Sequence, residues 1–131
     1  MTRTVLAVVA AASLIGAGAQ VFAHHSFTAA YDASKRVQIE GIVKEFVWRN
    51  PHSFVRIDVT TTAGATETWN LEWGSISQLS AAKYPVTRTT LRAGDRIVAA
   101  GEPSRDPGVK RIRIFSITRP IDGWQWDGVV D

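Results

Sequence analysis

The stretch Phe54–Trp73, "FVRIDVTTTAGATETWNLEW", decides the fold of this chain. From Val55 to Val59 every second residue is apolar, and this period of two is typical of a strand with one buried face. "TAGA" has turn chemistry, and "TETWNLEW" then alternates again, with apolar residues from Trp69 to Trp73 on one face. The stretch therefore predicts two neighbouring strands whose tryptophans line the core.

Strand patterns also lie on both sides of this pair. Residues 37–48, "VQIEGIVKEFVW", are rich in β-branched and aromatic residues, and we expect Gly41 to mark a bulge or bend. Residues 91–101, "LRAGDRIVAAG", indicate a turn that leads into a fourth strand, and residues 109–118, "VKRIRIFSIT", indicate a fifth. The last segment, "RPIDGWQWDGVVD", has turn chemistry and two tryptophans but no clear element.

One short helix is predicted between the third and fourth strands, from Ser75 to Ala82. Ser75 and Gln78 have the spacing of a capping box, and Tyr84-Pro85 ends the run. Three strands, a helix and two further strands follow one another in an OB-fold, a small five-stranded Greek-key barrel. We therefore predict an all-β fold, a small OB-like β-barrel. An SH3-like barrel is the alternative, because the strand count does not determine how the barrel closes.

The first 23 residues are predicted to be a secretory signal peptide. Arg3 supplies a positive start, residues 5–19 form an apolar run of 15 residues, and the small residues Val21 and Ala23 precede the expected cut. A membrane span needs about 20 apolar residues, so this run is short for one. We expect the mature chain to begin at His24 and to be periplasmic or secreted, with no membrane anchor. A cut four residues earlier and a retained leader are the alternatives.

The mature chain, residues 24–131, is long enough for a single domain with its own core. Loss of the leader removes one basic residue, so 14 basic and 12 acidic residues remain, and a net charge of +2 does not indicate a nucleic-acid partner. The chain has no cysteine, and its only methionine is Met1. Thiolate and thioether metal ligands are therefore excluded from the mature protein.

Four segments of the mature chain match a familiar pattern: "HHSFTAAYD", "GIVKEFVWRNPHSFVRIDV", "WNLEWGS" and "LRAGDRIVAAG". Together they resemble a family of small exported bacterial proteins that is classed as a domain of unknown function. The pairing of "HHSF" with "NPH" is the most specific part, whereas "IDGWQW" matches less well. The resemblance implies export and a barrel-like fold, and it implies no reaction.

All three histidines lie in these matching segments, and they are the candidate metal ligands. After cleavage, His24 would offer its free α-amine and its imidazole Nδ1 to one metal ion in a six-membered chelate ring. His52, held by Pro51 in the "RNPHS" loop, is the candidate second imidazole. Three nitrogens in this T shape form the arrangement called a histidine brace in copper proteins. His25 is the rival ligand, since its imidazole can share a metal with the same amine in a larger ring.

Ligand chemistry favours Cu(II), with zinc or nickel after it, because nitrogen donors with carboxylate support suit these ions in that order. Asp32, Glu45 and Glu72 are candidate oxygen ligands or hydrogen-bond partners of the histidines, and nothing in their spacing selects one. The competing interpretation is structural: the His-His pair is then an unstructured start, and "NPH" is a turn. Three histidines without cysteine form a weak motif by the standards of zinc sites.

Two functions of different classes follow from the sequence. The first is an exported metal-binding module, most concretely for Cu(II), that uses His24 and His52. The second is an OB-like interaction domain for a glycan, peptide or protein partner, in which no metal is bound. Trp124 and Trp126 either fold back over a barrel end or form a stacking surface for a ligand. An enzyme is the least favoured class, since no nucleophile–base arrangement or carboxylate pair can be placed.

Overall fold

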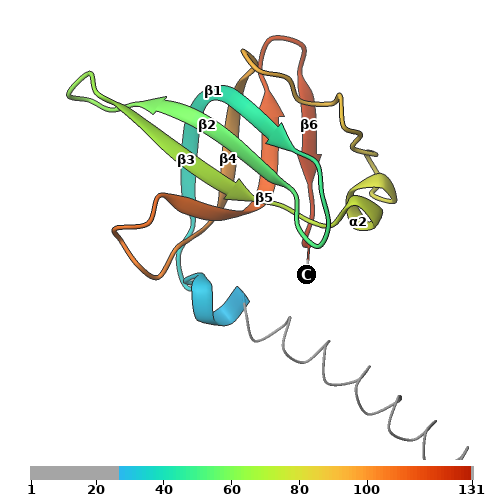
Figure 1. Cartoon of the computed structure of the whole chain (residues 1–131), viewed down its shortest axis with the longest axis horizontal. Coiled ribbons are helices and arrows are strands. Elements are labelled where there is room, and N and C mark those ends of the chain that lie inside the picture. Colours follow the sequence, from blue (N-terminus) through green and yellow to red (C-terminus); the bar gives the residue numbers. More distant parts are fainter. Residues whose placement is uncertain (1–26, 131) are drawn as a thin grey trace, which may run out of the picture.

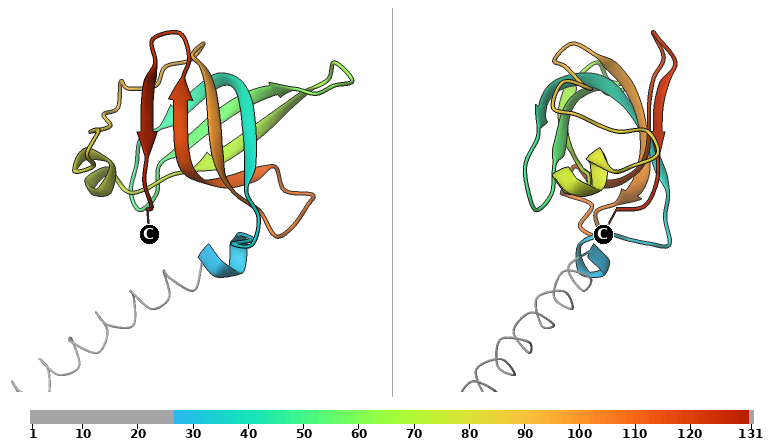
Figure 2. Two further views of the ribbon diagram at one scale, coloured as in Figure 1. Left: turned by 180° about the vertical axis from the view of Figure 1, so that it is seen from behind. Right: turned by 90° about the vertical axis from the view of Figure 1, so that its right-hand side faces the viewer.

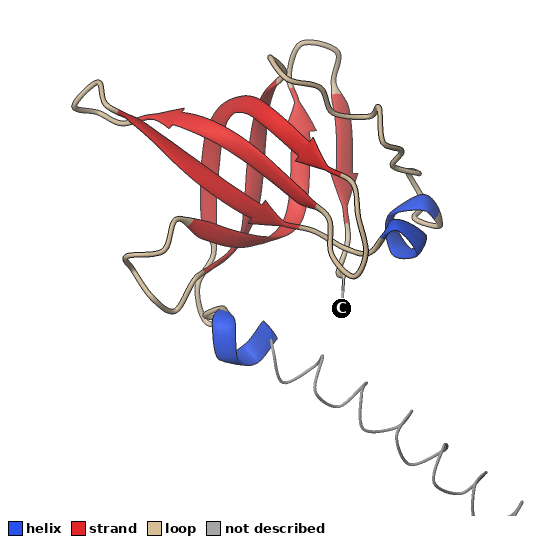
Figure 3. Cartoon of the chain, in the orientation of Figure 1, coloured by secondary structure: helices blue, strands red, loops and turns tan. Residues whose placement is uncertain are grey.

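Residues 27–130 are described by the computed structural model, in which six strands and a short helix follow one another along the chain (Figure 1). The elements are β1 (Val37–Val47), β2 (Phe54–Thr60), β3 (Thr66–Glu72), α2 (Ile76–Ser80), β4 (Arg96–Pro103), β5 (Arg111–Arg119) and β6 (Trp124–Asp127). Residues 27–30 add a single helical turn ahead of β1. Figure 3 shows how small the helical part is beside the strands, as an all-β fold requires.

The strands close into a barrel through one parallel pair. β1 pairs antiparallel with β2 and with β4, and the ladder continues from β2 to β3 and from β4 to β5. β3 and β5 then pair in parallel, with Leu71 opposite Ile112 and Glu72 opposite Arg113. This closure, with α2 inserted between β3 and β4, is OB-like rather than SH3-like, so the predicted all-β barrel is confirmed.

The barrel is filled by the apolar faces that the alternation predicts. Val55, Ile57 and Leu71 have no exposed surface, and each such side chain contributes about 1.5–3 kcal/mol by leaving water. Trp73 is also fully buried, whereas Trp69 is half-buried beneath the ammonium group of Lys110. The other fully buried core residues of the strands are Ile97, Ala99, Ile112, Ile114 and Ile117.

The bend of β1 differs in one detail from the expectation. The bulge lies between Val43 and Glu45 rather than at Gly41. Gly41 serves a close approach of strands instead, because a Cβ at this position would lie 2.6 Å from the carbonyl oxygen of Asp58. The Val43 carbonyl and amide bond to the turn before β4, which accounts for the interrupted register.

The predicted capping box of the helix is confirmed. The Ser75 hydroxyl accepts from the backbone N–H of Gln78, and the Gln78 side chain accepts from the backbone N–H of Ser75. The helix itself ends at Ser80, two residues earlier than expected. Leu79 is its buried residue, and Figure 2 shows α2 lying across one opening of the barrel.

The last segment forms an element that the sequence did not reveal. β6 pairs antiparallel with the second half of β5, and Trp126 lies buried against Trp73, with ring centroids 5.0 Å apart. Val130 is also buried, so the chain end completes the core. A four-residue strand has too few positions to show a period of its own, and it depends on β5 for its pairing. Within residues 27–130, no helix has the length and apolar character that crossing a membrane requires.

Candidate functional site

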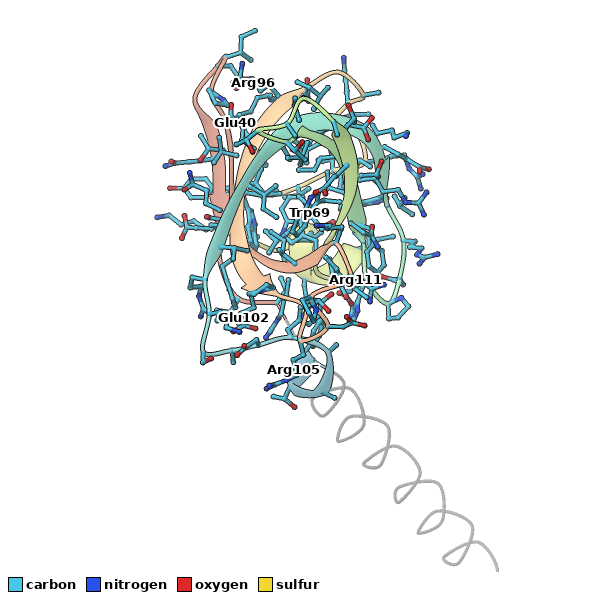
Figure 4. The ribbon with its side chains drawn as sticks, turned by 90° about the vertical axis from the view of Figure 1, so that its left-hand side faces the viewer. Glu40, Trp69, Arg96, Glu102, Arg105 and Arg111 are labelled. Carbon is cyan, nitrogen blue, oxygen red and sulfur yellow. The ribbon has the colours of Figure 1, made fainter. Side chains whose placement is uncertain are left out.

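Residues 27–36, which we call the lead-in segment, cross the outer face of the barrel before β1 begins. Tyr31 forms an isolated bridge with Ser104, and the backbone N–H of Asp32 donates to the carbonyl of Pro103. Arg105 donates its backbone N–H to Ala30. Figure 4 shows Arg105, Glu102 and Arg111 on the same side of the barrel as the helical turn, with Glu40 and Arg96 on the opposite side. The lead-in segment is therefore bound to the loop between β4 and β5.

His52 is held in place by its neighbour in the loop between β1 and β2. Ser53 is fully buried; its N–H donates to Gly74 over 2.9 Å, and its carbonyl accepts from Trp73 over 2.8 Å. These two bonds extend the β2–β3 ladder by one residue pair. The Asn50–Pro51 peptide is cis. The extended ladder places the imidazole of His52 beside the end of β3.

A buried carboxylate connects His52 to Tyr31. The Nδ1 atom of His52 lies 2.6 Å from Oε1 of Glu72, and the Tyr31 hydroxyl donates to Oε2 of the same carboxylate. Glu72 is 8% exposed and Tyr31 is 1% exposed. We call these three residues the Glu72 cluster. Both oxygens of its central carboxylate have a partner, so the burial of this group is compensated.

The chemistry of the cluster determines which nitrogen of His52 faces outward. Burial raises the pKa of the Tyr31 hydroxyl, and the hydrogen bond to Glu72 raises it further, so that the phenol keeps its proton at neutral pH; Arg111 opposes this in part. A carboxylate only accepts hydrogen bonds, so the hydrogen that binds Oε1 belongs to Nδ1 of His52. In its neutral form, the imidazole therefore carries its lone pair on Nε2.

Phe27, the first residue that the structure describes, lies beside this imidazole. Its ring stacks on that of His52, with centroids 4.8 Å apart and planes 28° from parallel. The guanidinium of Arg113 lies 4.4 Å from the centroid of the same ring. His24 and His25 lie outside the described residues, as does the predicted signal peptide.

The three carboxylates considered from sequence have different surroundings. Glu72 is the one that meets His52. Asp32 bonds to the hydroxyl of Ser34, which lowers the pKa of that carboxyl, and Glu45 pairs with Arg56 on the surface. Tyr31 was not a candidate, although it lies in the "HHSFTAAYD" segment. No local pattern could have selected it, because its partner is 41 residues away.

The described residues do not complete a metal site by themselves. Within residues 27–130, no group of three His, Asp or Glu side chains is arranged to hold an ion. What they contain is one imidazole, oriented by a carboxylate, next to the point where the lead-in segment begins.

A second group lies at the other end of β5 and includes Arg119, Asp95 and Asp122; we call it the Arg119 cluster. The Arg119 guanidinium bonds to Asp95 over 2.9 Å, to both oxygens of Asp122 and to the carbonyl of Thr90. Its Cζ atom lies 5.5 Å from the ring centroid of Trp124, which is half-buried. Trp124 is thus covered by Arg119, and Trp126 belongs to the core, so the two tryptophans fold back onto the barrel and do not form a stacking surface.

The fold and the site define a class: a small OB-like barrel that carries a carboxylate-oriented histidine beside its lead-in segment. The chain belongs to the Family of unknown function (DUF6152), which matches residues 10–112. This confirms the resemblance seen in the sequence. The match ends within β5, although residues beyond it supply part of the core. A search of curated proteins gives no match.

Proposed function

We propose that this protein is an exported metal-binding domain that holds one Cu(II) ion through the amine and imidazole of His24 and through Nε2 of His52. The observation that carries the proposal is the 2.6 Å contact between His52 Nδ1 and the buried Glu72. Metal-binding histidines almost always donate their second ring nitrogen to a carboxylate, a carbonyl or water, which fixes the tautomer and the ring orientation. His52 has this partner before any metal binds.

The position of Phe27 supports the contribution of His24. Its stacking on His52 holds the chain three residues after His24. An α-amine has an ordinary pKa of about 7.7–8.0, so a metal ion can displace its proton at neutral pH. Removal of the signal peptide is what creates this amine. In this proposal, export and cleavage therefore precede metal binding, and the protein acts as a periplasmic or secreted carrier, buffer or sensor component.

The ligand set favours Cu(II) over softer or harder ions. Two imidazoles and an amine are nitrogen donors, and the general affinity order then places copper above nickel and zinc. With no cysteine in the chain and its only methionine at position 1, the mature protein lacks the sulfur ligands that favour Cu(I). Zinc and nickel are the competitors to be measured beside copper.

Four variants of the exported protein test the site: His24→Ala, His25→Ala, His52→Ala, and a chain with one glycine inserted ahead of His24. The glycine keeps every side chain and displaces only the amine. A brace should lose at least about tenfold in Cu(II) affinity in this variant, or roughly 1.4 kcal/mol. The electron spin resonance spectrum should change with the insertion and with His24→Ala and His52→Ala, whereas His25→Ala should leave it unchanged.

The same experiment separates the two ligand assignments. If His25→Ala abolishes binding and His24→Ala does not, the amine shares its metal with His25 instead. Unaltered affinity and spectra after the glycine insertion would exclude the amine chelate. Intact mass must first show that the exported chain starts at His24, because a chain that starts at Gln20 or retains the leader excludes the brace.

A second function, an OB-like interaction domain without a metal, is supported by the loops at this site. The loop with His52 and the loop between β4 and β5 both contact the lead-in segment, and these are the loops with which OB-folds bind ligands. Thermal unfolding separates the two functions. Copper at 100 times its dissociation constant should stabilise a metal-binding domain by about 2.7 kcal/mol, whereas an interaction domain should show no such shift.

A further inference from the structure

The buried hydroxyl of Tyr31 has a role that burial alone does not explain. Phenylalanine would fill the same space without a polar atom to satisfy, yet the hydroxyl is buried and bonds to Glu72. We propose that Tyr31 is a positioning residue for His52. By occupying one oxygen of the Glu72 carboxylate, it leaves the other oxygen to Nδ1 of His52 and so determines that Nε2 is the nitrogen presented outward. The functional meaning of this inference rests on the proposed metal site.

The geometry of the two contacts carries the inference. Tyr31 OH reaches Oε2 and His52 Nδ1 reaches Oε1, so the two partners share a single carboxylate without competing for one oxygen. Glu72 is the last residue of β3, and its backbone is held on both sides, by Phe54 of β2 and by Arg113 of β5. The backbone of Glu72 is therefore fixed. Tyr31 restrains the rotation of the carboxylate group about the last bond of the side chain.

Such a restraint matters because a histidine in water prefers the opposite tautomer, with its hydrogen on Nε2. A ring in that form carries its lone pair on Nδ1, which faces the Glu72 carboxylate. The Glu72 carboxylate reverses the preference by accepting from Nδ1. Without the Tyr31 hydroxyl, Oε2 lacks its donor, and the carboxylate can turn away from the imidazole.

Tyr31 also connects this orientation to the docking of the lead-in segment. The residue lies in the bridge with Ser104, and the helical turn just before it contains Phe27, which stacks on His52. The segment thus contacts the imidazole directly through Phe27 and indirectly through Tyr31 and Glu72. The docked segment therefore orients His52 through both contacts.

The test is the ring tautomer of His52 in the metal-free exported protein, read from ¹⁵N chemical shifts in long-range ¹H–¹⁵N spectra. The spectra are recorded at a pH where the ring is neutral, and His52→Ala assigns its signals. Wild type should show a protonated Nδ1 and an unprotonated Nε2. Tyr31→Phe should move the two shifts towards each other, as expected for a mixture of tautomers. Tyr84→Phe is the matched control, since it removes the hydroxyl of the other tyrosine, which is 40% exposed.

Copper binding provides the second readout. Removal of an outer partner of a metal-binding histidine costs about 10–100-fold in affinity. The loss of copper affinity should therefore lie in this range for Glu72→Gln and should be about tenfold or smaller for Tyr31→Phe. An unchanged His52 tautomer in folded Tyr31→Phe would overturn the positioning role, even if wild type binds copper. A changed tautomer in a protein that binds no copper would retain the positioning role and exclude the proposed metal site.

Discussion

At one end of β5, Glu72 lies between Tyr31 and His52, whereas at the other end Arg119 lies between Asp95 and Asp122. The Glu72 cluster is buried, and its central charge is satisfied by a phenol and an imidazole. The Arg119 cluster is at the surface, and opposite charges of the same chain satisfy it: the Asp122 side chain is 49% exposed. The two clusters thus differ in burial. They also differ in whether a polar atom remains available for a ligand.

That difference makes the Glu72 cluster the better match to the proposed metal site. The Arg119 guanidinium donates to two carboxylates and a backbone carbonyl, and it covers Trp124. The cluster therefore holds the loop before β4 against the end of β5. His52 uses one ring nitrogen on Glu72, and the structure assigns Nε2 no partner among residues 27–130. A buried partner on one side and an available nitrogen on the other is the arrangement that a ligand-binding histidine needs.

Glu72→Gln should produce the largest loss of stability in the comparison, about 3 kcal/mol. The amide keeps one oxygen acceptor and presents an N–H group to the other of two donating partners, and it loses the charge, whereas hydrogen bonds to charged groups contribute about 1.5–3 kcal/mol each. Urea unfolding of the metal-free protein measures the loss. Asp122→Asn, in the Arg119 cluster, should leave the midpoint within experimental scatter because surface pairs contribute little. Equal losses would remove the distinction between the clusters.

Tyr31→Phe should cost about 1–2 kcal/mol at pH 7, and the cost should depend on pH. The folded protein raises the pKa of Tyr31 above the value of about 10 that a tyrosine has in an unfolded chain. A raised pKa contributes stability that is fully present below pH 10 and is lost as the pH rises, because the unfolded chain then releases the proton and the folded one does not.

The unfolding midpoints of wild type and Tyr31→Phe should therefore approach each other above about pH 10. Thermal unfolding from pH 7 to pH 11 checks this, with Tyr84→Phe as a measure of what the loss of a hydroxyl does at a more exposed site. A gap that stays constant up to pH 11 would show that the Tyr31 hydroxyl is not the source of the difference.

Arg119→Ala should cost roughly 1 kcal/mol and leave Cu(II) affinity unchanged. The substitution removes the bonds to Thr90 and Asp95 that fix the loop before β4, and it touches nothing in the Glu72 cluster. Urea unfolding and a copper titration on the same sample measure both quantities. A loss of copper affinity comparable to that of Glu72→Gln would mean that β5 couples its two ends.

Added salt should have the smallest effect on stability. It should distinguish the two clusters because it screens exposed charges more than buried ones. In 1 M NaCl the screening length falls to about 3 Å, which weakens exposed pairs more than buried ones. The stability difference between wild type and Arg119→Ala should shrink by a few tenths of a kcal/mol, whereas the difference for Glu72→Gln should not change. Similar shrinkage for both variants would place Glu72 in contact with solvent ions.

The strands and the capping box could be predicted from sequence because they depend on close neighbours. Apolar residues at every second position direct Val55 and Ile57 to one face whatever lies opposite. β6 could not be predicted, since its four residues become a strand by pairing with β5. The closing contact of the barrel, Leu71 beside Ile112, joins strands 41 residues apart and follows from the path of the whole chain.

The sequence by itself determined the fold class and marked His52 as a candidate ligand. Alternation, turn residues and rare histidines can all be recognised from short stretches of sequence. Tertiary structure alone decided which carboxylate His52 meets. Asp32, Glu45 and Glu72 carry the same chemical group, and Glu72 was selected by the one-residue extension of the β2–β3 ladder at Ser53, which brings residue 52 beside the end of β3. It also decided that Tyr31 completes the cluster, since a hydrogen bond across 41 residues forms only after the barrel has closed and the lead-in segment has crossed its outer face.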